Sequence, residues 1–173
     1  MKNEKRKMEM KKVLGAGVIL LCFWSTASAQ VPPDRDGLLN GEGMGQAKYA
    51  EMNGYPGPKH VLELAAELNL NERQKESVQK IYDVMRAQAL SIGKLIVHEE
   101  ERLHAAFGNK QVSQDTVDAI SDRVGRLRGR LRAVHLVAHL GAKMILGREQ
   151  IETYKTLRGV GGEHHDMMQK HTQ

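Results

Sequence analysis

The sequence contains a single cysteine, Cys22, among its 173 residues. Because no cysteine follows it, the rest of the chain cannot be cross-linked by internal disulfides and must gain its stability from packing or assembly. Aromatic residues are also scarce, at 4% of the chain. A core with few rings and many Leu, Val, Ile and Ala side chains favours helices packed on helices. We therefore expect an all-α protein.

The sequence also lacks the patterns of common catalytic sites. There is no cysteine nucleophile beyond Cys22 and no serine within a G-x-S-x-G turn. The glycines at positions 41, 43 and 45 do not follow a strand pattern, so they do not predict a phosphate-binding loop. We expect no enzyme activity.

The sequence has no long apolar run, and the apolar run near the N-terminus is short. A basic stretch precedes about a dozen apolar residues at Val13–Trp24, and the small residues Ala27 and Ala29 come next. This order predicts a secretory signal at residues 1–29, cleaved before Gln30. A membrane span needs roughly 20 residues, more than this apolar stretch offers. The alternative interpretation is an uncleaved membrane anchor. We expect the rest of the chain to act in the bacterial periplasm, without stable membrane insertion.

Charge does not indicate a nucleic-acid partner. The chain has 26 Lys and Arg against 21 Asp and Glu, a net charge of +5. Residues 1–29 hold six of the basic and two of the acidic side chains, so the remainder has 20 against 19. The basic excess therefore lies mainly in the segment that export removes.

Helical spacing divides the exported chain into segments. Residues 30–57 are rich in Gly and Pro and read as a flexible N-terminal arm, with one or two helical turns between Met44 and Met52. A short helix follows from Pro58, and a long helix begins after Asn71, where Gln74 completes a capping box. A second long helix follows Ser113, and a last helix spans 148–157. The tail, 160–173, is rich in His and Met.

Both long helices carry apolar residues at steps of three and four, the spacing of one helix face. Joined by a short turn near Gly108, they should form an antiparallel hairpin roughly 50 Å long. Residues 133–146 are apolar on nearly all sides, which predicts burial on more than one side. A two-helix hairpin alone buries little apolar surface. We therefore expect the short helices and the second subunit of a homodimer to cover it.

Two segments that flank the hairpin share a pattern. LNERQ at residues 70–74 and LGREQ at residues 146–150 resemble the paired L-T-x-x-Q motifs of the Spy/CpxP family of periplasmic proteins, with Asn71 and Gly147 in place of Thr. The segments NGYPGPKHVLEL (53–64), VHLVAHL (134–140) and YKTLRG (154–159) resemble a subgroup often labelled periplasmic heavy-metal sensors. The resemblance covers about residues 41–160.

The resemblance implies a four-helix, bent-hairpin domain at 58–159 that dimerises. Some family members are ATP-independent chaperones in envelope stress, and others bind zinc or sense nickel or cobalt. The chain departs from the nickel and cobalt branch: Ala138 and Ala142 stand where that branch has a His and a Met, and the first helix has only His60. That sensor site is therefore not expected here.

A cationic region on the second long helix suits a chaperone. Together with exposed aliphatic and Met side chains, it would hold unfolded envelope proteins, or a periplasmic sensor domain, without ATP. The expected client-binding residues are Arg123, Arg126, Arg128, Arg130 and Arg132.

Histidines provide the alternative function, a metal-binding sensor or buffer. His135 and His139 lie four residues apart on one helix face, a spacing that lets two imidazoles bind one metal ion. Pairing of the long helices would place them near Tyr82 and Met85, and a third ligand could come from His60, from Glu63 or from a partner subunit. The same two histidines also suit hydrogen-bonded core positions. The tail offers a weaker site at His164, His165 and His171. No cofactor is required, and zinc or another divalent transition metal is the candidate ligand.

Overall fold

The computed structural model describes residues 31–160, and within that range the protein is all-α with no strand. The predicted signal segment, 1–29, and the tail residues His164, His165 and His171 lie outside the described residues. No helix within 31–160 is both long and apolar enough to cross a membrane. The helices are α1 (Arg35–Asn40), α2 (Lys48–Met52), α3 (Pro58–Glu63), α4 (Glu72–Gly108), α5 (Gln114–Ile145) and α6 (Arg148–Arg158).

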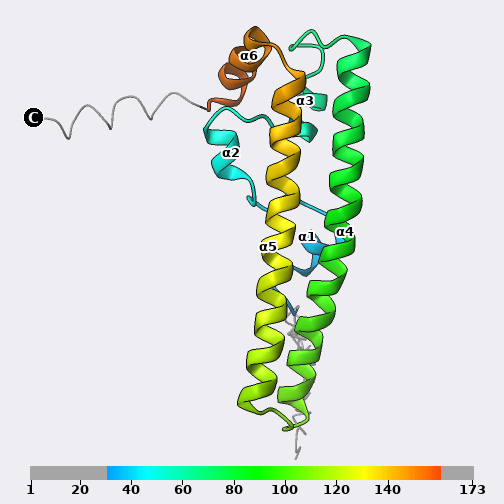
Figure 1. Ribbon diagram of the computed structural model, residues 1–173, viewed down its shortest axis with the longest axis vertical. Coiled ribbons are helices and arrows are strands. Elements are labelled where there is room, and N and C mark those ends of the chain that lie inside the picture. The colour runs from blue at the N-terminus through cyan, green and yellow to red at the C-terminus, as the bar shows by residue number, and fades with distance from the viewer. Residues whose placement is uncertain (1–30, 161–173) are drawn as a thin grey trace, which may run out of the picture.

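The long helices α4 and α5 form the predicted antiparallel hairpin (Figure 1). Asn71 begins α4 as expected: its side chain accepts from the Gln74 amide at 2.9 Å, and Gln74 accepts in return from the Asn71 amide at 3.2 Å. Ser113 begins α5 and accepts from the Thr116 amide at 3.2 Å. These caps satisfy amides that have no partner within the helix, so they fix where each long helix starts.

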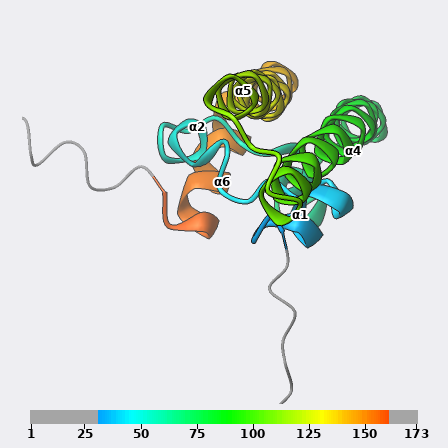
Figure 2. The same cartoon turned by 90° about the horizontal axis from the view of Figure 1, so that it is seen from below.

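The short helices lie on one side of the hairpin layer. Figure 2 shows α1, α2 and α6 on the same side of α4 and α5. There α1 and α3 contact α4, while α2 contacts α5. The hairpin therefore has a covered face and, on the other side, a face that no helix of residues 31–160 covers. We call this second side the bare face.

Two apolar clusters hold the short helices in place. One lies around the middle of the hairpin, where Leu38 of α1 packs among side chains of α4 and α5. The other lies at the end where α3, α4 and α6 meet, around Tyr154 and Val61, which have no exposed surface. Burial of apolar surface is the main stabilising contribution here.

The arm contains more helix than the one or two turns expected between Met44 and Met52. Residues 31–57 contain α1 and α2, and Leu38 and Ala47 are buried. Gly93 makes the close approach of α1 possible, because a Cβ there would lie 2.2 Å from the carbonyl oxygen of Leu38. Arg128 adds a bidentate ion pair with Asp34, at 2.7 and 3.2 Å. These anchors explain why a Gly-rich segment is ordered.

The glutamines of the two repeated motifs bind each other. Gln74 donates to Gln150 at 2.8 Å, and Gln150 donates back at 3.1 Å. Each amide group also donates to a backbone carbonyl, Gln74 to Ile145 and Gln150 to Leu68, both at 3.0 Å. The Gln150 oxygen accepts from the Gly147 amide at 2.9 Å. The pair therefore joins the start of α4 to the start of α6 and closes that end of the hairpin.

Candidate functional site

A cavity of about 700 Å³ lies between the hairpin and the arm. His135 and His139 line it from α5, and Tyr82 and Met85 line it from α4, as the predicted helix pairing places them. His60 of α3 lies at the same cavity. Both α5 histidines are buried, with 3% and 9% of their surface exposed. Burial lowers the pKa of both, and the neighbouring His139 lowers that of His135 further.

His139 is held by the arm. Its Nδ1 lies 2.8 Å from the carbonyl oxygen of Tyr55. Because a carbonyl only accepts, Nδ1 must carry the proton, which leaves Nε2 of the neutral ring as an acceptor. Nε2 lies beside Gly57, since a Cβ on that glycine would be 3.1 Å away. His139 therefore presents a free lone pair at the glycine.

His60 is oriented in a comparable way. Its Nδ1 lies 2.9 Å from the carboxylate of Glu63, three residues on along the chain. A carboxylate only accepts, so Nδ1 is the nitrogen that donates in this contact. The ring also borders Gly57, because a Cβ there would lie 3.6 Å from Cδ2 of His60. Both rings therefore flank the same point next to Gly57.

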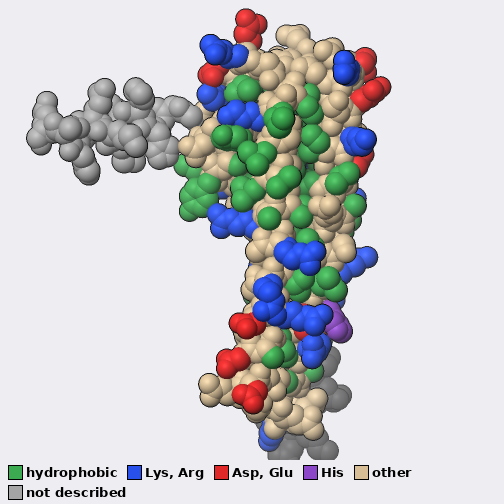
Figure 3. All heavy atoms as spheres, viewed as in Figure 1, with side chains coloured by type: hydrophobic (Ala, Val, Ile, Leu, Met, Phe, Trp, Pro, Cys, Tyr) green, Lys and Arg blue, Asp and Glu red, His purple; other side chains and the backbone are tan. Residues whose placement is uncertain are grey.

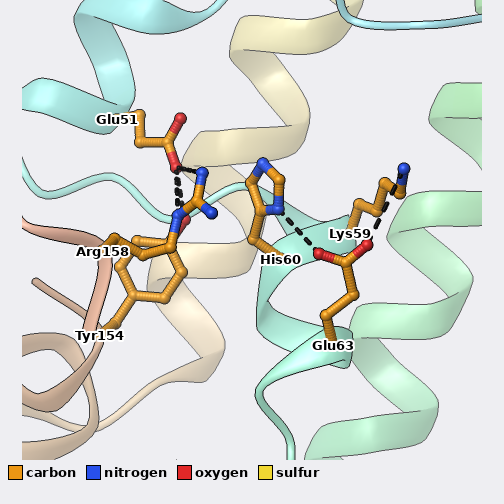
Figure 4. Close-up of polar contacts among 6 residues, drawn as sticks. All are labelled: Glu51, Lys59, His60, Glu63, Tyr154 and Arg158. Atoms are coloured by element: carbon orange, nitrogen blue, oxygen red, sulfur yellow. Dashed lines mark hydrogen bonds and ion pairs between the residues drawn. The ribbon is translucent and has the colours of Figure 1, made fainter.

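A partly buried carboxylate, Glu51, binds Tyr154 and Arg158 beside His60 (Figure 4). Glu51 accepts from the Tyr154 hydroxyl at 2.8 Å and from Arg158 at 3.1 Å. Burial alone would raise the pKa of Glu51, but the Tyr154 hydrogen bond and the Arg158 charge hold it below its ordinary value. Burial, together with the bond to Glu51, raises the pKa of Tyr154. Glu51 is thus ionised and anchored at the cavity wall.

His135 differs from its neighbours. It lines the cavity, but its Nε2 is buried and has no hydrogen-bond partner within residues 31–160. Within that range no three His, Cys, Asp or Glu side chains converge in a ready ligand group. The described residues therefore bring His135 and His139 to one cavity without forming a closed metal cage around them.

The bare face of the hairpin is the second candidate site. On α5, Val137, Leu140 and Met144 are 63%, 51% and 87% exposed, and on α4 Val84 is 51% exposed. Figure 3 shows hydrophobic side chains gathered over the upper parts of α4 and α5, with Lys and Arg below them. Two shallow hollows of about 400 and 440 Å³ share Gln88, Val134 and Val137 on this face. Residues 133–146 are thus apolar on two sides, one covered within the chain and one exposed.

The five arginines of α5 lie in different environments. Arg128 pairs with Asp34 and Glu100, Arg123 with the buried Glu99, and Arg132 stacks over the Tyr49 ring. Arg126 is 71% exposed and lies 3.9 Å from Asp122. Arg130 lines one of the two hollows, beside Ala133 and Val137. Arg126 and Arg130 continue the heptad stripe of Ala133, Val137, Leu140 and Met144 along α5.

The contacts that orient the cavity side chains were not predicted from the sequence. Tyr55 was assigned to the arm, and neither its carbonyl nor the Glu51–Tyr154 pair has a signal in the sequence. A signal did exist for His60 and Glu63, because a His and a carboxylate three residues apart lie on one helix face. Comparison with protein-family models, curated protein sequences and solved structures gave no match.

Proposed function

We propose that the exported protein is an ATP-independent chaperone that holds unfolded envelope proteins on the bare face of its helical hairpin. The observation that carries the proposal is the exposed apolar stripe of Val137, Leu140 and Met144, which the two arginines Arg126 and Arg130 extend. Monomeric soluble proteins rarely leave a large contiguous apolar patch in water unless it binds something.

The chemistry of this stripe suits clients of varied sequence. Its hollows are shallow, so no single side chain fits them tightly, and Met144 is unbranched and adapts to many shapes. Arg126 and Arg130 add attraction for acidic segments. Such a surface favours many weak contacts with unfolded chains over one specific ligand.

The resemblance to the Spy/CpxP family supports the same proposal. The paired glutamines, which the family motifs share, bind each other at the closed end of the hairpin. We propose that the domain at 58–159 is a bent-hairpin subunit of this type, acts in the periplasm and has no catalytic role.

The stripe can be tested with a triple variant, Val137→Ser, Leu140→Ser and Met144→Ser. We expect the variant to fold normally, because exposed side chains contribute little to stability. It should lose most of its ability to suppress light scattering by an aggregating unfolded client in the absence of nucleotide. The control variant is Phe107→Ser with Leu157→Ser, which removes two residues of comparable exposure, 56% and 48%, from other places. Equal suppression by both variants would refute the client surface.

We also propose that two copies pair across the bare face when no client is present. Pairing would remove the same apolar stripe from water, which is the dominant driving force of most protein association. Light scattering of the exported chain should give a dimer mass at micromolar concentration, and the triple serine variant should shift it towards the monomer. A monomer mass for the unmodified chain would exclude the dimer.

A further inference from the structure

We propose that the cavity between the arm and the hairpin binds a small organic dicarboxylate. The cavity has a volume of about 700 Å³, and ligand pockets in proteins generally measure about 300–1,000 Å³. The arm forms one of its walls, so a ligand there would lie on the covered side of the hairpin and leave the bare face free. The site therefore goes beyond the holding function and can be tested separately from it.

The first argument is a pair of cations without acidic partners. Lys48 of α2 and Arg86 of α4 both line the cavity. Neither side chain forms an ion pair with an acidic residue within 31–160. A guanidinium can donate two parallel hydrogen bonds to one carboxylate, and a lysine ammonium attracts another carboxylate as a compact charge. Because the two cations come from separate helices, they suit a ligand with two anionic groups.

The carboxylates of the lining do not cancel these two cations. Only Glu42 and Glu51 contribute carboxylates to it. Glu51 accepts from Tyr154 and Arg158, so Arg158 already offsets its charge. Glu42 can therefore offset one of the two lining cations at most, and the cavity keeps a positive excess. That excess favours an anionic ligand over a cationic one.

The second argument is a set of backbone donors on the arm. Residues 43–45 and Ala47 line the cavity. Their amides donate to no backbone carbonyl and no side chain within residues 31–160. Backbone N–H groups are strong donors, and their hydrogen bonds to an ionised carboxylate are stronger than those to a neutral acceptor. Next to Lys48, these amides give the oxygens of a bound carboxylate both charge and hydrogen bonds.

The third argument is the apolar part of the wall. Tyr82 and Met85 line the cavity from α4, and Pro58 lines it from α3. Met85 and Pro58 are buried, and Tyr82 is half-buried. These side chains offer apolar contact to a carbon skeleton, and an inorganic anion has no apolar surface with which to use it. The lining therefore fits an organic dicarboxylate better than an inorganic oxyanion.

The test is calorimetric titration of residues 30–173 with two dicarboxylates, succinate and isophthalate, at low ionic strength. We expect one ligand per chain and a higher melting temperature with the ligand present. Sulfate, which has the charge without the carbon skeleton, should bind more weakly. Isophthalamide, which has the skeleton without the charge, should not bind. Arg86→Gln and Lys48→Gln should each weaken dicarboxylate binding by about tenfold or more, the loss expected for a hydrogen bond to a charged group.

The matched control is Lys94→Gln, which removes the same charge from an exposed lysine of α4 outside the cavity and should leave the affinity unchanged. Gly43→Leu keeps every cation but narrows the cavity, because a Cβ there would lie 3.8 Å from Nδ1 of His135. It should abolish binding.

The triple serine variant of the bare face should bind dicarboxylates normally, so a failure of the holding function would leave this result intact. The proposal is overturned if neither dicarboxylate gives heat above that of dilution, or if sulfate binds as tightly as the dicarboxylates. It is equally overturned if Lys94→Gln weakens binding as much as Arg86→Gln, since the attraction would then come from the charge of the whole protein.

Discussion

Tyr154→Ala should destabilise the protein by about 3–5 kcal/mol, the usual cost of truncating a fully buried aromatic side chain. Tyr154 has no exposed surface and lies at the centre of the cluster that joins α6 to α3 and α4. Its loss would leave a cavity at the closed end of the hairpin and free Glu51 from its hydroxyl partner. Chemical denaturation of residues 30–173 would measure the loss as a lower midpoint.

Tyr154→Phe separates packing from hydrogen bonding. It keeps the ring and removes only the bond to Glu51, which retains its contacts with Arg158. A hydrogen bond to a charged group contributes about 1.5–3 kcal/mol, so the Phe variant should lose clearly less than the Ala variant. Equal losses would mean that the hydroxyl, and not the packed ring, is what holds α6.

Stability should also fall as the pH falls from about 7 to about 5, because of the two buried histidines. The pKa values of His135 and His139 are lowered in the folded state, chiefly by burial. The unfolded chain therefore binds protons at a pH where the folded chain does not. Stability is fully present above the unfolded pKa of about 6.5 and is lost as the pH drops towards the lowered folded values. Each such proton contributes at most about 1.4 kcal/mol per pH unit.

Melting temperatures measured across this pH range test the effect. His135→Leu removes the histidine whose Nε2 has no partner, and it should flatten the pH dependence while stabilising the protein at pH 5 relative to the unmodified chain. His139 should respond less simply, because burial lowers its pKa while the Tyr55 carbonyl and the Glu51 charge partly offset that shift. The control is His98→Ala, which removes an exposed histidine of α4. A His135→Leu variant with the original pH slope would contradict this assignment.

The parts of the fold that follow local rules could be predicted from the sequence. Asn71 and Ser113 were recognised as caps because the chemistry of a helix start is contained within four residues. The apolar seams of α4 and α5 predicted the hairpin, and the chain pairing placed His135 near Tyr82 and Met85. All of these depend on spacing along one or two helices.

The contacts between distant segments could not be predicted. The order of residues 31–57 depends on Leu38 reaching the space above Gly93 and on Asp34 reaching Arg128, and neither pairing has a local signal. His60 and His139 both border Gly57, and spacing along the chain does not reveal that they meet there. The sequence shows that residues 133–146 are apolar on more than one side, but it does not show which side the short helices cover.

The most direct measurement of the central proposal is photo-crosslinking from single positions. A photoreactive side chain would be placed at Val137, Leu140 or Met144 on the bare face, and at Tyr49, Phe107 or Leu157 as exposed controls. With an unfolded client in excess, the account predicts strong crosslinks to the client from the three bare-face positions and weak ones from the controls. Crosslinks of equal strength from both sets, or stronger ones from the controls, would contradict it.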